Sequence, residues 1–470
     1  MKAGQHGWII FVATGVFYAQ ATPDAVRVLD QVRDRVVKRI SHLPDYTCVQ
    51  TINRSYFRRA RRQQPAPSCS QIHADKEAQR DHLGLYLTDR LRLDVKVSGS
   101  EEIGSWAGAS QFNAKSIFDF VGGGPFGTGA LGTFATDVFT SGEARFSYIG
   151  EKLENSSTLY TYRYRVPLEA SHYRIRVWNN WQPIPYEGEV EVDPQSLEIR
   201  HLLVRAGQLP PESDTCEMET RVDYAVAQMN TGEFLLPRQT KMHLMNTDGD
   251  ERDVTTTYAE CREYRSESAI FFEDHPVARA EKNTKAAGSA ALPKGLPITL
   301  ELVSPIDTDV AAAGDVVMER VRWPVRERGS KNVLIPEGAT VRGRIVQMQH
   351  WTTRPARFEI AILLESWEVD DISAPLYAEP NGGEATRGVL INLPPIAQST
   401  RVRIFVFMTG RKHYVVPRGF ASRWITVTAP GELTRGTTCP PRASACFRIS
   451  ATPSRLRSDN LEPGTAFVAI

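Results

Sequence analysis

Three glycines in the first half of the chain have a spacing that could bind a nucleotide. Gly122, Gly124 and Gly127 lie in the stretch SIFDFVGGGPFGTGALGTFATDVF, residues 116–139, and reproduce the pattern G-x-G-x-x-G. The acidic residue Glu143 follows about 20 positions later, as a dinucleotide-binding fingerprint requires. In that fingerprint the pyrophosphate lies at a helix N-terminus and the acidic residue binds a ribose. Taken alone, the spacing would predict an oxidoreductase.

The elements around these glycines argue against a nucleotide site. A dinucleotide fold needs parallel strands joined by helices, with the glycine turn directly after the first strand. Here the glycines follow a long stretch of strand and loop patterns, and antiparallel-looking strands come after them. Pro125 lies in the variable part of the motif, and Gly127 is followed by Thr128 rather than by the lysine of a phosphate loop. We therefore predict no nucleotide cofactor.

The same stretch is better explained as two short helices at about 114–121 and 129–139. The glycines between them, Gly122, Gly123 and Gly124, would form a hinge in which positive φ is needed. The helices would plug or cover the concave face of a sheet. The nearby aromatic side chains would line an apolar ligand cavity or simply pack in a core; they are Trp106, Phe112, Phe118, Phe120 and Phe126.

Catalytic patterns are otherwise absent from the sequence. It contains no G-x-S-x-G, no H-E-x-x-H and no EF-hand loop. Ser171 precedes His172, but neighbouring residues on a strand point to opposite faces and cannot act as a nucleophile–base pair. With 55 carboxylates, some acidic pair arises by chance. We expect a protein that is not an enzyme and has no catalytic residues; a hydrolase with an unrecognised site is an alternative.

The six cysteines are expected to form disulfides. None belongs to a C-x-x-C motif and the ten histidines are scattered, so no metal site is predicted. Cys439 and Cys446, which flank the short loop PPRASA, are the favoured pair, and Cys48 with Cys69 is the second choice. Cys216 and Cys261 begin and end a run of three strands, which places them too far apart to bond to each other.

The first 21 residues read as a secretory signal peptide. Lys2 is followed by an apolar run from Trp8 to Tyr18 and by the small-x-small site Ala19-Gln20-Ala21. The apolar run is too short to span a bilayer, and no later window is long enough. With 470 residues, 41% hydrophobic and 24% charged, the chain can bury real cores. Its formal charge of +1 indicates no general polyanion partner such as nucleic acid.

Apolar periodicity predicts a helix followed by antiparallel strands. From Thr22 to Leu43 the apolar residues recur at helical spacing, and Pro23 and Asp24 suit a helix start. From residue 83 to 97 the apolar residues are odd-numbered, which is typical of a strand with one buried face. Asp248-Gly249 marks a hairpin turn. The basic run RSYFRRARR is either a solvated edge strand or a reader of anionic headgroups.

A capped helix, the stretch LPDYTCVQTINRSYFRR and long alternating strands together resemble the lipoprotein-carrier architecture of LolA and LolB. The resemblance covers residues 22–276. Segments such as EIGSWAGASQF and CREYRSESAIFF are also similar to uncharacterised acidobacterial-type envelope proteins. In the LolA and LolB fold, a curved antiparallel half-barrel wraps around helices and holds acyl chains. The resemblance therefore implies an apolar ligand.

Residues 277–292 are rich in Ala, Lys and Gly and read as a linker. Residues 293–430 resemble the C-terminal β-domain of TrbI-type conjugal-transfer proteins, through the motifs around Ile306-Asp307-Thr308 and Ile335-Pro336-Glu337-Gly338. This resemblance implies a small β-barrel domain used for interaction. Gly314 and Gly338 lie where turns need positive φ. Residues 431–470 look like an irregular tail.

The sequence thus predicts a mainly β protein with an N-terminal helix, exported to the bacterial periplasm or secreted. The favoured function is non-catalytic binding or carriage of a lipid or other apolar ligand in the cell envelope. A structural or assembly factor that docks on an envelope protein partner is the main alternative. No nucleic acid, stable membrane span, metal or cofactor is expected.

Overall fold

The computed structural model describes residues 23–60, 67–78, 82–98, 101–109, 112, 121, 124–177, 180–207, 209–264, 292–370, 372–383, 389–392, 404–428 and 466–469. The predicted signal peptide and linker, and the cysteines Cys439 and Cys446, lie outside these residues. The described residues form two large hydrophobic cores, and Ala361 and Val406 form a small separate cluster. The first belongs to residues 23–264, with Ala313 added to it, and the second belongs to residues 292–428. We call these two parts the first and second units.

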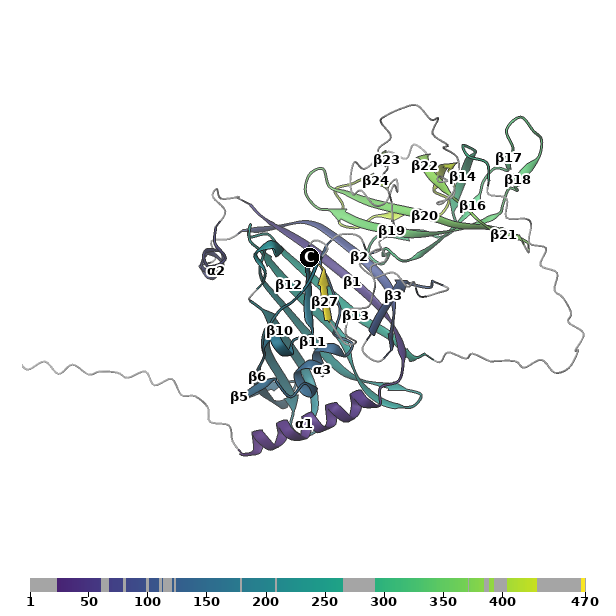
Figure 1. The fold of residues 1–470 in the computed structure, drawn as a ribbon. Coiled ribbons are helices and arrows are strands. Elements are labelled where there is room, and N and C mark those ends of the chain that lie inside the picture. Colours follow the sequence, from purple (N-terminus) through teal and green to yellow (C-terminus); the bar gives the residue numbers. More distant parts are fainter. Residues whose placement is uncertain are drawn as a thin grey trace, which may run out of the picture.

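The first unit is built on one curved antiparallel sheet of ten strands (Figure 1). Its spatial order is β3-β2-β1-β13-β12-β11-β10-β9-β6-β5. The strands are β1 (Tyr46–Arg59), β2 (Leu83–Ser98), β3 (Glu101–Trp106), β5 (Arg145–Glu154), β6 (Ser157–Val166), β9 (Tyr186–Asp193), β10 (Glu198–Ala206), β11 (Thr215–Met229), β12 (Gly232–Asn246) and β13 (Glu251–Glu263). The prediction of a mainly β half-barrel with an N-terminal helix is confirmed.

Side-chain alternation explains why these strands bend around one core. In β2 the odd-numbered residues from Leu87 to Val97 are buried and the even-numbered ones are not, as the leucine pattern predicts. The β12–β13 hairpin turns at Asp248-Gly249, where Gly249 has φ of 79°. Gly188 in β9 meets β10 so closely that a Cβ there would lie 1.7 Å from the Leu203 carbonyl oxygen.

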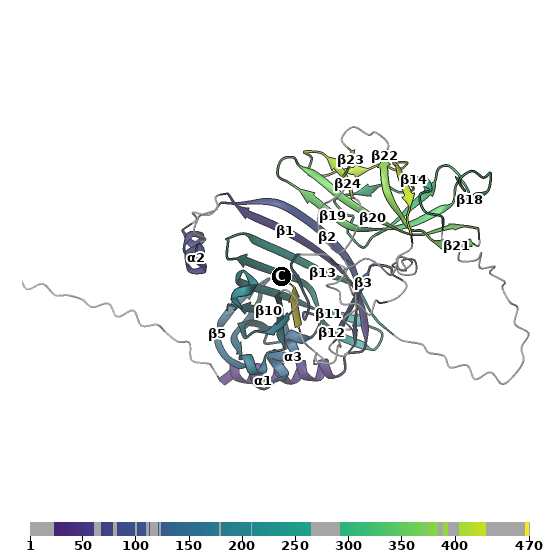
Figure 2. The same cartoon turned by 45° about the horizontal axis from the view of Figure 1, so that its top comes forward.

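Helix α1 (Pro23–Ser41) packs on the concave side of this sheet. Its buried stripe includes Ala25, Val32 and Val36, at the spacing expected of an amphipathic helix. The Tyr162 hydroxyl donates a hydrogen bond to the Ala25 carbonyl oxygen at 2.7 Å. Figure 2 shows α1 beneath the strands together with helix α3 (Thr133–Thr140), which contacts it.

A second layer fills the space enclosed by the curved sheet. It contains α3 and a small sheet of four strands in the order β4-β27-β7-β8. These strands are β4 (Phe126–Gly127), β7 (Tyr173–Val177), β8 (Asn180–Pro183) and β27 (Ala466–Ala469). The predicted helix at about 129–139 is therefore confirmed as α3, whereas the predicted helix at about 114–121 lies outside the described residues except for Val121. Strand β27 lies in the segment predicted to be an irregular tail, and it pairs in parallel with β7.

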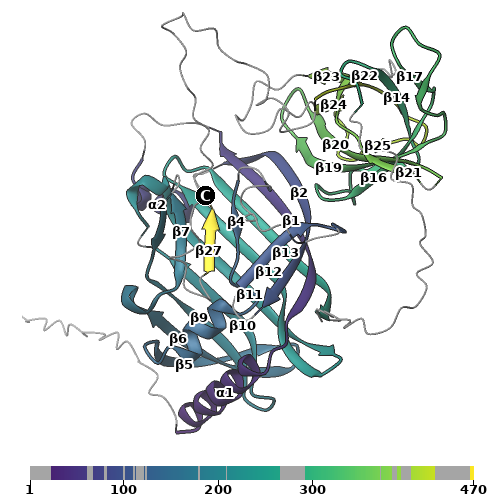
Figure 3. The same cartoon turned by 45° about the vertical axis from the view of Figure 1, so that its right-hand side comes forward.

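The second unit is a curled antiparallel sheet in the order β22-β26-β14-β16-β19-β20-β24-β23, with β21 also paired to β20 (Figure 3). Its strands are β14 (Pro297–Leu302), β15 (Ile306–Asp307), β16 (Val316–Val321), β17 (Val325–Arg326), β18 (Val333–Ile335), β19 (Thr340–Trp351), β20 (Arg357–Val369), β21 (Ile372–Pro375), β22 (Ala378–Gly383), β23 (Val389–Asn392), β24 (Ile404–Met408), β25 (Val415–Val416) and β26 (Ala421–Thr426). Gly314 and Gly338 have φ of 113° and 81°, as predicted.

The small β-barrel domain predicted for residues 293–430 takes the form of a curled sheet that does not close in the part that the structure describes. Strands β22 and β23 end the ladder and lie beside each other without pairing. In β22, Pro380 has no N–H to donate, and the register against β26 shifts between Pro380 and Gly382. The other pairs, β15–β25 and β17–β18, form separate short ladders.

The two units join along one edge of β2. Residues Leu93–Ser98 of β2 pair with β3, whereas Leu87–Asp89 pair with the end of β19. Between them, Ala313 forms a bridge: its N–H donates to the Arg90 carbonyl oxygen at 2.8 Å, and its own carbonyl accepts from the Arg92 N–H at 2.6 Å. Both units thus contribute to one hydrogen-bonded sheet.

Arg344 secures this junction from the second unit. It is only 3% exposed, and its Nη1 donates to the carbonyl oxygens of Ala107 and Gly314, each at 2.6 Å. Its Nε donates to Glu365 at 2.6 Å, so the buried charge is compensated. A Cβ on Gly314 would lie 2.0 Å from the Arg92 carbonyl oxygen, so glycine is required there by close approach as well as by φ.

Two disulfides tie distant parts of the first unit together. Cys48 of β1 bonds to Cys261 of β13, and Cys69 of helix α2 (Cys69–Glu77) bonds to Cys216 of β11. The predicted pair Cys48–Cys69 is therefore wrong, because the antiparallel pairing of β1 with β13 places Cys48 next to Cys261. As predicted, Cys216 and Cys261 do not bond to each other.

Candidate functional site

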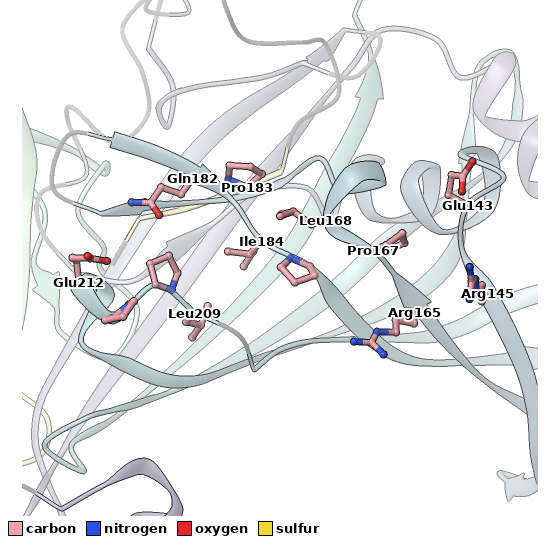
Figure 4. A pocket seen from close by; sticks show the side chains of 13 residues that line it. Glu143, Arg145, Arg165, Pro167, Leu168, Gln182, Pro183, Ile184, Leu209 and Glu212 are labelled. Carbon is pink, nitrogen blue, oxygen red and sulfur yellow. The ribbon is translucent and has the colours of Figure 1, made fainter.

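An open cleft of about 780 Å³ lies at one end of the first unit (Figure 4). This volume falls within the range of small-molecule binding sites, about 300–1,000 Å³. Four segments build it: the start of β5, the end of β6 with the 3-10 turn η2 (Leu168–Ala170), the end of β8, and the loop at η3 (Pro211–Ser213). The lining residues are Glu143, Arg145, Arg165, Pro167, Leu168, Gln182, Pro183, Ile184, Pro185, Leu209, Pro210, Pro211 and Glu212.

Apolar side chains form the middle of the cleft. Figure 4 shows Leu168, Ile184 and Leu209 grouped between the arginines on one side and Gln182 and Glu212 on the other. Ile184 is buried and its N–H donates to the Tyr173 carbonyl oxygen at 3.0 Å, so the floor is fixed to β7. Leu168, by contrast, is 46% exposed. The cleft therefore offers both a rigid apolar floor and an apolar wall that faces solvent.

Prolines make the walls of the cleft stiff. Pro167 precedes η2, and Pro210 and Pro211 begin η3. Pro183 and Pro185 flank the buried Ile184. Because proline has a fixed φ and no backbone N–H, such walls lose little entropy on binding and expose few unsatisfied donors to an apolar ligand.

An arginine pair stands at one side of the cleft. Arg145 of β5 and Arg165 of β6 are directly opposite each other in the antiparallel register, and both are exposed. Side chains in such positions lie about 5 Å apart at Cβ, and like charges there destabilise the sheet. Neither arginine forms an ion pair with any residue that the structure describes, although Glu187 of β9 lies directly opposite Arg165 in the register. An anionic group placed between the guanidinium groups would relieve this repulsion.

The predicted cavity aromatics do not come together at the cleft. Phe126 is 2% exposed and belongs to the first core, whereas Trp106 packs beside Gly314 at the junction of the units. Phe112 lies against Tyr264, with ring centroids 6.4 Å apart. Phe118 and Phe120 lie outside the described residues. The interpretation of plain core packing fits Phe126; a role in ligand binding for the set stays a prediction.

The concave side of the curved sheet is packed by the segment of residues 124–140, which we call the plug. Phe126 and Phe134 of the plug are buried there, and Phe134 lies 5.1 Å from the Tyr173 ring centroid. A cavity beside Phe134 and Tyr258 measures about 20 Å³, which is room for about one water molecule.

Polar contacts fasten the plug to the sheet. Tyr46 of β1 donates to the Leu131 carbonyl oxygen at 2.9 Å, and Glu102 of β3 accepts from the Gly129 N–H at 2.9 Å. Desolvation of the Glu102 carboxyl raises its pKa to about 7. The predicted hinge is described only at Gly124, which has φ of 105° and lies so close to β1 that a Cβ would be 2.3 Å from the Tyr56 hydroxyl oxygen. Gly122 and Gly123 lie outside the described residues.

The Ser171-His172 dipeptide does not form a nucleophile–base pair. The Ser171 hydroxyl donates to the Ile184 carbonyl oxygen at 2.6 Å. The His172 ring instead lies 2.8 Å from Asp137, a carboxylate that also accepts from the Tyr186 hydroxyl at 3.1 Å. Burial raises the pKa of Asp137. These contacts fasten α3 to β9 and to the turn before β7.

Sequence reasoning missed the arginine pair, although one signal was present. Asn155 and Ser156 both have positive φ, of 47° and 70°, and connect β5 to β6 as a two-residue hairpin turn. Folding the strands back on this turn places Arg145 opposite Arg165 once the register shift between Tyr148 and Gly150 is included. The apolar floor has no comparable signal, because Leu168, Ile184 and Leu209 come from separate connections.

No protein-family profile and no curated protein sequence matches the chain. Among solved structures, a LolA superfamily protein from Nitrosomonas europaea is 9% identical, covering 52% of this chain and 98% of its own, with a TM-score of 0.23. A DUF1329 family protein from Desulfovibrio piger is 10% identical, covering 54% and 98%, with a TM-score of 0.24. ComB10 of the Com type IV secretion system of Helicobacter pylori is 12% identical, covering 29% and 86%, with a TM-score of 0.19.

The predicted resemblance to LolA-like and conjugal-transfer proteins is thus confirmed. The identities and TM-scores are low, so function has to be argued from this chain's own residues. No described helix is long and apolar enough to cross a membrane.

Proposed function

We propose that this chain is an exported, non-catalytic cell-envelope protein that binds or carries an amphiphile with an anionic headgroup, such as a fatty acid or phospholipid, in the cleft of Figure 4. The observation that carries the proposal is the arginine pair beside an apolar floor. Arg145 and Arg165 would bind the headgroup through charge-assisted hydrogen bonds, and Leu168, Ile184 and Leu209 would contact the acyl chain.

The energetics favour an acyl chain over a small polar ligand. Each buried methylene contributes about 0.8 kcal/mol, so burying ten of them offers roughly 8 kcal/mol before the entropy of association is subtracted. Charge-assisted hydrogen bonds to the headgroup add about 1.5–3 kcal/mol each. The headgroup contacts thus determine which amphiphile binds, and the apolar floor supplies most of the affinity.

The covalent structure supports a location outside the cytosol. Disulfides persist in oxidising compartments such as the bacterial periplasm. The bonds Cys48–Cys261 and Cys69–Cys216 both link residues from distant parts of the sequence, so they stabilise the native fold by restricting the unfolded chain. This agrees with the signal peptide predicted for residues 1–21.

A fluorescent fatty acid titrated into the full chain tests the proposal. The variant Arg145→Gln/Arg165→Gln should weaken binding at least tenfold, because losing about 1.5 kcal/mol of headgroup interaction is a factor of about ten. Arg163→Gln is the matched control, since Arg163 lies on the same strand and faces Glu189 instead of the cleft. A fatty alcohol of the same length should bind the wild type and the double variant equally.

Two outcomes would contradict the proposal. Saturable binding that the double variant leaves unchanged would move the ligand away from the cleft. No saturable binding of either probe would remove the carrier function, and the docking of this chain on an envelope protein partner would take its place.

A further inference from the structure

A cluster of metal-ligating side chains lies on the convex face of the first unit, on the opposite side of the sheet from α1. Glu191 of β9 and His201 of β10 are direct partners in the antiparallel ladder. Glu154 at the end of β5 reaches the same place. One ligand atom from each of these three residues lies within 4.8 Å of the others. Three strands therefore present one imidazole and two carboxylates to a common point.

The histidine ring is held in a defined orientation. Its Nδ1 lies 2.6 Å from an oxygen of Asp223, the partner of His201 on β11. Its Nε2 faces the Glu154 carboxylate at 3.0 and 3.1 Å, and Glu191 Oε2 at 3.9 Å. Metal-binding histidines commonly donate one ring N–H to a carboxylate and direct the other nitrogen to the ion. Asp223 occupies that supporting position.

Glu191 supplies an independent observation. The residue is 8% exposed, and its Oε2 is buried yet accepts no hydrogen bond. Its Oε1 accepts from Lys152 at 2.8 Å, and the nearest cation to Oε2 is Arg221 Nη2 at 3.5 Å. A buried carboxylate oxygen that accepts no hydrogen bond costs stability, and the Arg221 guanidinium compensates Glu191 Oε2 only through an ion pair at 3.5 Å. His201 Nε2 lies 3.9 Å from this oxygen.

The local charge also favours a cation. Glu154, Glu191 and Asp223 carry three negative charges, whereas Lys152 and Arg221 carry two positive ones. A metal-bound imidazole is uncharged, so these side chains would together present one net negative charge to a bound cation. The Lys152 side chain is 46% exposed and can move away.

We propose that Glu154, Glu191 and His201 bind one divalent transition-metal ion, with Zn²⁺ as the reference ion. Nitrogen and oxygen ligands lie about 2.0–2.2 Å from Zn²⁺, so ligand atoms of a tetrahedral site are about 3.3–3.6 Å apart. The distances of 3.0–3.9 Å from Nε2 to the carboxylate oxygens bracket this spacing. Three protein ligands leave one position for water, and the imidazole disfavours Ca²⁺ and Mg²⁺.

Competition of the untagged full chain against a chromophoric zinc chelator tests the site. The wild type should bind one Zn²⁺, and Glu191→Gln and His201→Gln should each weaken binding at least tenfold. Asp309→Asn is the matched control, because Asp309 belongs to another acidic and histidine cluster, with Asp307 and His413, that is largely exposed. It should leave the tight site unchanged. Circular dichroism should confirm that each variant folds.

Lys152→Met separates a metal site from an ordinary ion-pair network. Removing the competing ammonium should tighten zinc binding several-fold if Glu191 is a ligand. The proposal would be overturned if Glu191→Gln left zinc binding unchanged, if Asp309→Asn abolished it, or if Lys152→Met weakened it. A wild type that binds no zinc would also overturn it.

Discussion

Glu319 provides a sharp test of the core of the second unit. Its carboxyl is 2% exposed and lies among apolar side chains that include Leu302, Ile360 and Phe405. One oxygen accepts from the Ser422 hydroxyl at 3.2 Å, while Oε2 is buried without a hydrogen-bond donor. Desolvation raises the pKa of Glu319 from 4.5 to about 7.

The shift fixes both the sign and the size of the expected effect. Because the folded state holds the proton more tightly than the unfolded state, Glu319 favours folding most below pH 4.5, and this contribution falls as pH rises from 4.5 to about 7. Each pKa unit corresponds to about 1.36 kcal/mol, so the loss amounts to about 3 kcal/mol. Glu319→Gln cannot ionise and can still accept from Ser422. It should therefore be about 3 kcal/mol more stable than the wild type at pH 8 and nearly equal at pH 4.5.

Hydrogen exchange of peptides from β16 and β26 measures this locally. These strands contain Glu319 and Ser422, so the free energy of opening measured there reports on the second core. The titration of Glu102 in the first unit is thereby kept out of the measurement. Glu368→Gln, an exposed carboxyl on the same sheet, is the control and should match the wild type at every pH. A Glu319→Gln variant that keeps the wild-type pH profile, or that is less stable at pH 8, would refute the reasoning.

Two further changes test the junction and the disulfides. Gly314→Ala should destabilise the chain by several kcal/mol in thermal unfolding, since its Cβ would meet the Arg92 carbonyl oxygen. Gly338→Ala should cost only about 1 kcal/mol, because Gly338 has φ of 81° but nothing lies within 4 Å of the added Cβ. Equal costs would show that the close approach at Gly314 is absent. Replacing Cys69 and Cys216 by Ser should make α2 the first site of limited proteolysis, because that short helix buries only Ile72; unchanged cleavage would show that other contacts hold it.

Local periodicity made much of the fold predictable. The odd-numbered apolar residues of β2 and the helical stripe of α1 each specify the buried face of their own element, whatever that element packs against. The pairing of distant strands is not encoded so locally. The edge of β2 hydrogen-bonds to β19 and Ala313, residues more than 200 positions away, through backbone groups that leave no pattern in the sequence.

Non-local pairing also explains the incorrect disulfide and the misleading basic stretch. The predicted bond between Cys48 and Cys69 is wrong because β1 lies against β13, which brings Cys48 to Cys261. In the run RSYFRRARR, Arg54 is buried and bonds to Asp89 of β2 at 2.6 and 2.7 Å. Its role as one half of a buried ion pair depends on a strand register that the charge run does not reveal.

The candidate site was less predictable than the fold. The glycine-rich stretch matches a nucleotide-binding motif in spacing, yet the described part of it packs as a plug. The cleft is assembled from connections such as η2 and η3, and its arginines are adjacent only through the β5–β6 register. A residue pattern identifies such a site only after the hairpin has been folded.

Photoaffinity labelling with a diazirine-bearing fatty acid tests the central claim most directly. After irradiation of the full chain, peptide mass spectrometry should place saturable label on the segments that carry Leu168, Ile184 and Leu209, and excess unlabelled fatty acid should displace it. Label on the plug around Phe126 and Phe134 instead would place the ligand under the curved sheet. Label that is absent or cannot be displaced would contradict the binding of an amphiphile by this protein.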